Sequence, residues 1–254
     1  MLGWFFLQGV SMAGHSKFAN IKHRKGAQDK KRGKIFTKLI KEIMVAVKQG
    51  GPDVDANPRL RLAVQNAKGA NMPKDNVERA IKKASGEGGE NYSETTFEGY
   101  GVDGIAFFVE CATDNNTRTV ANIRSYFNKC GGNMGKDGCL EFIFNRKGVF
   151  ILNSEGINED DFTMEMIDAG AEDVKIADEF INVICEVEDF GNISKKLAEL
   201  KLEPIEAGLS RIPVTYKQLS QDTVSAFTKL LDALEDDDDV QKVYHNVENL
   251  EEFE

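Results

Sequence analysis

Residues 34–51 read Lys-Ile-Phe-Thr-Lys-Leu-Ile-Lys-Glu-Ile-Met-Val-Ala-Val-Lys-Gln-Gly-Gly, and they predict a helix over 34–49 with two distinct faces. At 100° per residue, the apolar side chains gather on one face, as a buried helix requires. They are Phe36, Leu39, Ile40, Ile43 and Val47. The lysines gather within about 80° on the opposite face. They are Lys34, Lys38, Lys41 and Lys48.

Two further helices follow in the sequence. Asn57-Pro58 supplies an N-cap and a first-turn proline for a helix that runs to about Gly69. Asn71-Met72-Pro73 begins the next helix, which Gly86 ends. Upstream, residues 17–32 are also expected to be helical. They are so rich in cations that we expect much of this stretch to become ordered only against a partner.

The charge of the chain is strongly divided. The whole sequence has 254 residues and a formal net charge of −10. Residues 12–86 contain 18 Lys and Arg against 6 Asp and Glu, whereas residues 87–254 contain 14 against 36. Such asymmetry indicates a basic module that faces nucleic acid, joined to an acidic body. The alternative is a basic face that is merely solvated.

After Gly86 the pattern changes to short strands alternating with single amphipathic helices, which is typical of α+β sandwiches. Strands are expected at 95–100, 105–111, 140–144, 148–152, 180–187, 212–216 and 240–246. Helices are expected at 118–129, 160–169, 192–200 and 222–235.

The predicted fold is therefore α+β with three domains, an all-helical basic domain and two small α+β domains, the second inserted in the first. The predicted boundaries are 12–86 for the helical domain, 87–140 plus 211–254 for the first α+β domain, and 141–210 for the inserted one. Residues 1–11 are apolar and lack the basic start of a secretory signal, so we expect the natural start at Met12.

Several motifs resemble catalytic or ligand sites, but each has a simpler interpretation. Gly99-Tyr-Gly101-Val-Asp-Gly104 matches a dinucleotide fingerprint, yet a strand follows it where a helix is required, so a hairpin turn is expected. The glycines from Gly131 to Gly138 could bind phosphate, although a helix C-cap followed by a loop is favoured. The acidic run 235–239 is expected to be a solvated turn rather than a metal site. Asp114–Thr119 is expected to cap a helix, with a polar contact surface as the alternative.

We find no support for enzymatic activity, a metal or a cofactor. The cysteines Cys111, Cys130, Cys139 and Cys185 form no C-x-x-C pair, and the three histidines do not fall at metal-ligand spacing with them. No stretch of eighteen apolar residues is present, so no membrane span is expected. A cytoplasmic protein without a small-molecule substrate is expected.

The basic segment, residues 17–48, carries eleven Lys and Arg against two acids. Phosphates repeat densely along nucleic acid, so a stripe of cations gains affinity by releasing counterions without reading bases. Phe18 and Phe36 could stack on bases, but packing is the favoured role for both. Spacing alone does not distinguish DNA from RNA.

Several strings of residues resemble the YebC/PmpR family. They are Met12-Ala-Gly-His-Ser-Lys17, Asn20-Ile-Lys-His-Arg-Lys25, Lys31-Arg-Gly-Lys-Ile-Phe36, Asn57-Pro-Arg-Leu-Arg61, Asn71-Met-Pro-Lys74, Glu98-Gly-Tyr-Gly101, Asp114-Asn115, Arg118-Thr119 and Cys130-Gly-Gly-Asn133. The resemblance spans Met12 to about Asn246. It implies a helical domain and two α+β domains around a cleft. It also implies a regulator that binds DNA, although a related mitochondrial protein activates translation.

We therefore expect a non-enzymatic nucleic-acid-binding regulator of transcription, with a translation factor that binds ribosomal RNA as the alternative. The residues expected to grip phosphates are Lys17, Lys22, His23, Arg24, Lys25, Lys30, Lys31, Arg32, Lys34, Lys38, Lys41, Arg59, Arg61 and Lys74. The acidic domains could also bind basic proteins. A scaffold that binds only proteins is a third alternative, and it predicts that no nucleic acid co-purifies with the chain.

Overall fold

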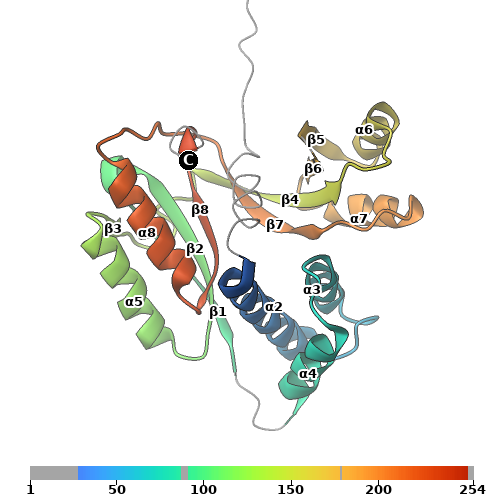
Figure 1. The fold of residues 1–254 in the computed structure, drawn as a ribbon, viewed down its shortest axis with the longest axis horizontal. Coiled ribbons are helices and arrows are strands. Elements are labelled where there is room, and N and C mark those ends of the chain that lie inside the picture. The colour runs from blue at the N-terminus through green and yellow to red at the C-terminus, as the bar shows by residue number, and fades with distance from the viewer. Residues whose placement is uncertain (1–27, 87–90, 178, 251–254) are drawn as a thin grey trace, which may run out of the picture.

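The structure is a computed structural model that describes residues 28–86, 91–177 and 179–250 (Figure 1). Within these ranges, helices come first along the chain, and two antiparallel sheets of four strands each follow. Antiparallel strands with helices placed to one side define the α+β class. The predicted fold class is therefore confirmed.

The predicted helix over 17–32 lies outside the described residues as far as Ala27, and its last part, 28–32, belongs to α2. The other three helices predicted for the N-terminal part are all present. Their bounds are α2 (Gln28–Gly50), α3 (Pro58–Gly69) and α4 (Lys74–Ser85). The Asn57 side chain accepts a hydrogen bond from the Leu60 amide at 3.1 Å, so the predicted N-cap of α3 is confirmed. Ile43 and Val47 of α2 are buried with Leu60 and Val77 of the neighbouring helices. Phe36 is partly buried against this core, so packing is its role here.

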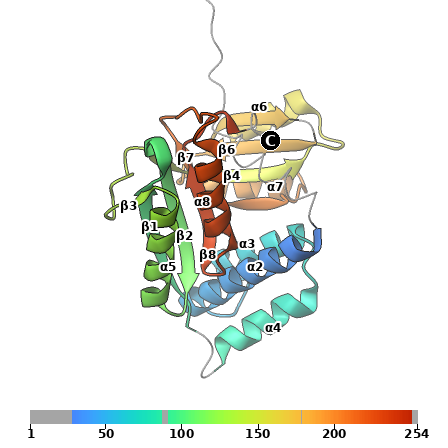
Figure 2. The same cartoon turned by 60° about the vertical axis from the view of Figure 1, so that its left-hand side comes forward.

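The first sheet has the strand order β3-β1-β2-β8. Its strands are β1 (Ser93–Tyr100), β2 (Ala106–Thr113), β3 (Asn133–Met134) and β8 (Val240–His245). Two helices, α5 (Asn116–Lys129) and α8 (Val224–Asp236), cover one face (Figure 2). Phe107, Phe127 and Phe227 are buried between the sheet and these helices. The last strand of this sheet thus comes from the C-terminal end of the chain.

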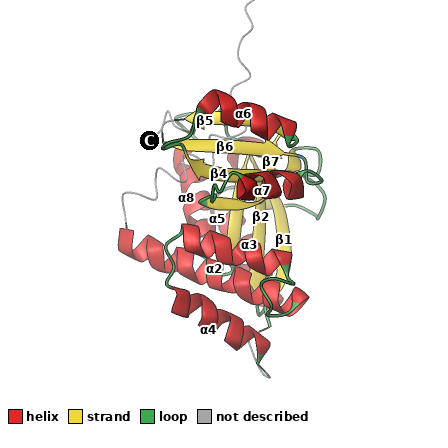
Figure 3. Ribbon diagram, turned by 90° about the vertical axis from the view of Figure 1, so that its right-hand side faces the viewer, coloured by secondary structure: helices red, strands yellow, loops and turns green. Residues whose placement is uncertain are grey.

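The second sheet has the strand order β5-β6-β4-β7. Its strands are β4 (Phe144–Asn153), β5 (Ala171–Ala177), β6 (Phe180–Cys185) and β7 (Glu206–Pro213). Its helices are α6 (Glu159–Asp168) and α7 (Phe190–Glu199), which share a core with one face of the sheet (Figure 3). Every strand of this sheet lies between β3 and β8 in the sequence, as an insertion requires. The exact domain boundaries stay a prediction.

Two strand predictions were wrong in detail, and two strands, the two-residue β3 and β5, were not predicted. The expected strand 212–216 belongs mostly to a turn, and its first two residues end β7 in the second sheet rather than the first. The expected strand 140–144 is a turn up to Ile143, where Leu140 is buried. Strand β5 was not predicted, because its alternating charges and its place at the sheet edge leave little apolar pattern.

The glycine-rich motifs follow the simpler interpretations. Gly99–Gly104 joins the antiparallel strands β1 and β2 through a short 3₁₀ turn, η1 (Val102–Gly104), so the hairpin prediction is confirmed. Gly131 has a φ of 75° directly after α5, which is the conformation of a helix C-cap. The Asn115 side chain accepts a hydrogen bond from the Arg118 amide and caps α5.

The helical region contacts both sheets. The Asn66 side-chain amide of α3 donates to the carbonyl of Ala207 at 2.8 Å and accepts from its amide at 2.9 Å, which fixes α3 against β7. Helix α2 lies against the turn between α8 and β8 (Figure 2). None of the helices in the described ranges is both long and apolar enough for a membrane span. All four cysteines are free thiols.

Candidate nucleic-acid interface

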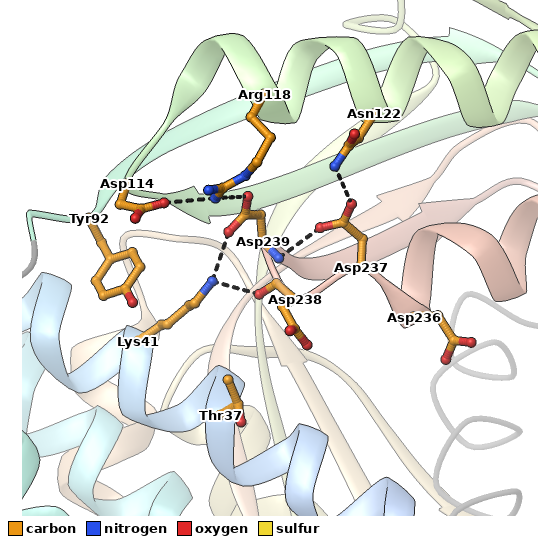
Figure 4. A pocket seen from close by; sticks show the side chains of 10 residues that line it. All are labelled: Thr37, Lys41, Tyr92, Asp114, Arg118, Asn122, Asp236, Asp237, Asp238 and Asp239. Atoms are coloured by element: carbon orange, nitrogen blue, oxygen red, sulfur yellow. Dashed lines mark hydrogen bonds and ion pairs between the residues drawn. The ribbon is translucent and has the colours of Figure 1, made fainter.

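The lysine face of α2 lies against the acidic segment, residues 235–239, which joins α8 to β8 (Figure 4). The Lys34 ammonium forms an ion pair with the Asp236 carboxylate. The Lys38 ammonium donates a hydrogen bond to the Glu235 carbonyl oxygen at 3.3 Å. The lysines of the predicted cationic face therefore do lie on one side of α2, and part of this face contacts an anionic segment of the same chain.

Lys41 occupies a different environment from the one expected for a phosphate ligand. Its side chain is 8% exposed. Its ammonium group donates to the Asp239 carboxylate at 2.9 Å and to the Asp238 carbonyl at 2.8 Å. The Tyr92 ring lies 5.0 Å from the same nitrogen. The lysine is thus enclosed between α2 and the first sheet, where it holds these elements together.

Asp239 is the centre of this network. Its carboxylate accepts hydrogen bonds from Arg118 at 2.7 Å, Thr119 at 2.9 Å and Thr113 at 3.1 Å, in addition to Lys41. Burial by itself would raise the pKa of this carboxyl group, but the hydrogen bonds from Arg118, Lys41 and Thr119 outweigh burial and bring the pKa to about 2. Asp239 is therefore a fixed negative charge that joins α2, α5 and β8.

Asp237 is also engaged rather than solvated. Its carboxylate accepts from the Tyr126 hydroxyl at 2.9 Å and from the Asn122 amide at 3.3 Å, both on α5. Burial, together with the hydrogen bond to Asp237, raises the pKa of Tyr126 to about 12. The prediction of a solvated turn over 235–239 was wrong for Asp237 and Asp239, whereas Asp236 and Asp238 are exposed as expected.

These side chains border an open depression of about 540 Å³ between α2, α5 and the acidic segment (Figure 4). Carboxylates surround it, with Lys41 and Arg118 as the basic groups among its lining residues. Within the described ranges, no three His, Cys, Asp or Glu side chains are grouped to hold a metal ion.

The remaining predicted phosphate ligands have varied surroundings. Arg59 forms an ion pair with Glu94, and hydrogen bonding to Glu94 raises the pKa of Arg59. Arg61 donates to backbone carbonyls of the preceding turn. Lys74 is exposed and pairs with Glu78 at 3.3 Å within α4. Arg32 is exposed, and its guanidinium lies 5.4 Å from the Phe36 ring centre.

The other predicted ligands lie at the N-terminal end. Lys30 and Lys31 belong to α2, but their side chains lie outside the described residues. The residues that lie wholly outside them are Lys17, Lys22, His23, Arg24 and Lys25. The structure thus brings Lys34, Lys38 and Lys41 together on one helix face, while Arg59, Arg61 and Lys74 lie on or beside other helices.

The network around Asp239 was missed at the sequence level. The acidic run itself was visible, and so was the capped start of α5 at Asn115. Lys41 and Asp239 are 198 positions apart in the sequence, so no local spacing relates them. Only the opposite charges of the lysine face and the acidic run pointed toward a contact.

Comparison with known proteins supports a family assignment over nearly the whole chain. Residues 16–87 match the TACO1/YebC protein N-terminal domain, and residues 92–247 match the TACO1/YebC second and third domain. A relative from Amoebophilus asiaticus is 52% identical over 241 residues, which cover 94% of this chain and 99% of the relative. One from Clostridium botulinum is 52% identical and covers 93% and 97% of the two chains. Both carry the name "probable transcriptional regulatory protein".

A solved structure has the same fold. The crystal structure of a conserved hypothetical protein from Aquifex aeolicus superposes with a TM-score of 0.79 at 41% sequence identity. The superposition covers 88% of this chain and 91% of the Aquifex protein. Together with the two family matches, this similarity confirms the resemblance found in the sequence motifs: the chain belongs to the TACO1/YebC family.

Proposed function

We propose that this chain is a regulator of transcription that binds DNA through its basic segment and has no catalytic role. The observation that carries the proposal is the charge density of residues 17–48, with eleven Lys and Arg against two acids. The names of the relatives agree with such a role. A stripe of this kind binds phosphates through counterion release, independently of base sequence.

The proposed contacts follow the N-terminal part of α2 and the residues before it. Arg32 is exposed, and Lys34 and Lys38 are partly exposed, so all three can approach a phosphate backbone. Lys30 and Lys31 directly precede them in the same helix. The upstream members of the set are Lys17, Lys22, His23, Arg24 and Lys25. In this proposal Lys41 is a positioning residue that fixes the angle of α2 through Asp239.

The acidic body supports this function by confining the nucleic acid. Carboxylates of the acidic segment line the depression beside Lys41, and they repel phosphates that approach from that side. Arg59 and Lys74 are already paired with Glu94 and Glu78. They are secondary contacts that phosphate reaches only by displacing a carboxylate, since exposed pairs of this kind are weak.

The nature of the target is tested with the intact chain in a gentle, low-salt lysate. A sucrose-gradient profile is recorded without nuclease, with DNase and with RNase. Co-sedimentation with DNA that DNase abolishes is the expected result. Migration with ribosomes that RNase abolishes would contradict the DNA proposal and favour ribosomal RNA. A chain that stays at the top in all samples, with a ratio of absorbance at 260 and 280 nm typical of protein alone, would contradict nucleic-acid binding altogether.

A further inference from the structure

The contact between α2 and the acidic segment has an outer part and an inner part. In the outer part, Lys34 pairs with Asp236, and their side chains are 40% and 74% exposed. Lys38 adds a hydrogen bond to the Glu235 carbonyl. In the inner part, Lys41 and Asp239 are 8% and 7% exposed.

The two parts differ in how easily they open. An exposed ion pair contributes little to stability and is weakened further by salt. Removing one partner of a buried pair is strongly destabilising, because an unpaired charge remains in the interior. The outer contact can therefore exchange partners in solution while the inner contact holds α2 in place.

We propose that the outer acidic segment and a nucleic-acid backbone are alternative partners of the same α2 surface, centred on Lys34 and Lys38. Binding of the nucleic acid displaces Asp236 from Lys34 while Lys41 stays paired with Asp239. This inference rests on the proposed nucleic-acid binding. It adds that the chain carries its own competitor for phosphate, which lowers its affinity.

The positions of charged residues also indicate how far along α2 the bound nucleic-acid backbone extends. Toward the N-terminus of the helix, cations follow one another at Lys30, Lys31, Arg32 and Lys34. Toward its C-terminus, the exposed carboxylates of Asp236 and Asp238 flank the lysine face. Phosphates beyond Lys38 would face these carboxylates at close range. The nucleic-acid backbone is therefore expected to lose contact with α2 near Lys38.

The test is the affinity of the full chain for a fluorescently labelled 20-base-pair DNA duplex, measured by anisotropy from 50 to 200 mM salt. Asp236→Asn removes the competing charge with little change in shape. Glu155→Gln, at an exposed turn of the second sheet, is the matched control for the loss of one negative charge. Asp236→Asn should bind about two- to fivefold more tightly than this control, which corresponds to an exposed pair.

If Asp236 and phosphate compete for Lys34, the effect of Asp236→Asn on affinity must depend on Lys34. In a Lys34→Gln background, Asp236→Asn should give a smaller gain in affinity than in the natural background, because the shared cation is gone and only the repulsion between Asp236 and phosphate is relieved. Equal effects of Asp236→Asn and Glu155→Gln in the natural background would overturn the competition while leaving nucleic-acid binding intact. An undiminished gain in the Lys34→Gln background would also overturn it. Absence of binding by the unmodified chain would overturn both proposals, and circular dichroism verifies folding of each variant.

Discussion

Replacing Asp239 by Asn should destabilise the protein strongly, although the two side chains have almost the same shape. The substitution removes the charge that Lys41 and Arg118 share, and Lys41 keeps only carbonyl partners in a buried position. Breaking a buried ion pair from one side costs about 3–5 kcal/mol. Because the Arg118 side chain is half exposed, water can hydrate its guanidinium in the variant. We therefore expect a loss of unfolding free energy near the lower end of this range, at about 3 kcal/mol.

The assay is urea unfolding followed by circular dichroism. Asp238→Asn is the matched control, since this neighbour is exposed and its carbonyl, rather than its carboxylate, accepts from Lys41. The control should remain within about 0.5 kcal/mol of the unmodified chain. A loss of under about 1 kcal/mol for Asp239→Asn, or equal losses for the two variants, would refute the assigned role of the buried network.

The same comparison has a predicted dependence on pH. The pKa of Asp239 is about 2 in the folded protein, below its ordinary value of 3.8, so its contribution is complete above about pH 4 and disappears as pH falls toward 2. The stability gap between the unmodified chain and Asp239→Asn should therefore narrow by roughly 2 kcal/mol over that interval. A gap that stays constant from pH 5 to pH 2 would show that the carboxylate is not the stabilising group.

Two other substitutions test the buried contacts. Burial lowers the pKa of His245 to about 4, so the unfolded chain takes up a proton first as pH falls from 6.5. Between pH 7 and 4.5 the unfolding free energy should drop by roughly 2–3 kcal/mol through His245. His245→Gln should remove that part of the drop in urea titrations at the two pH values, and an unchanged drop would contradict the assignment. A Cβ at Gly69 would lie 1.9 Å from the Ile205 carbonyl oxygen, so Gly69→Ala should cost about 1–3 kcal/mol in thermal or urea unfolding. Gly33→Ala is the control: its Cβ meets nothing within 4 Å, so it should stabilise α2 by about 0.5–1 kcal/mol, and equal effects of the two would contradict the packing of α3 on the second sheet.

The helices were predictable because their signals are local. In α2 the apolar residues repeat every three to four positions, and this period alone identifies the buried face that contains Ile43 and Val47. Asn57 and Pro58 define the start of α3 within two positions. The signal that ends α5 after Lys129 is equally local, since Gly131 takes the left-handed conformation that such a helix end favours.

Strands β5 and β7 were harder to predict, because sheet edges need no continuous apolar pattern. Strand β5 is one edge strand of the second sheet, and β7 is the other. Strand β7 contains Gly208 and Arg211, and Arg211 lies with its guanidinium 3.6 Å from the Phe108 ring centre in the first sheet. A charged residue that packs across two sheets looks like a loop residue in the sequence alone.

The cationic site was predictable in composition but not in its partners. Periodicity correctly places Lys34, Lys38 and Lys41 on one face of α2, where all three contact the acidic segment. Whether each lysine meets solvent or carboxylate depends on residues about 200 positions away. Burial of Lys41 follows from this tertiary contact, which no local pattern encodes.

The most direct test of phosphate binding by the basic segment is the salt dependence of DNA affinity for the full chain and for Lys30/Lys31/Arg32→Ala. Lys136/Lys195/Lys229→Ala, three exposed lysines outside α2, is the control for equal loss of charge. Loss of the three α2 contacts should weaken binding on every DNA sequence and reduce the slope of log affinity against log salt by about 2–3. The control should leave the slope nearly unchanged. Equal slopes for the unmodified chain and Lys30/Lys31/Arg32→Ala would contradict the proposed interface.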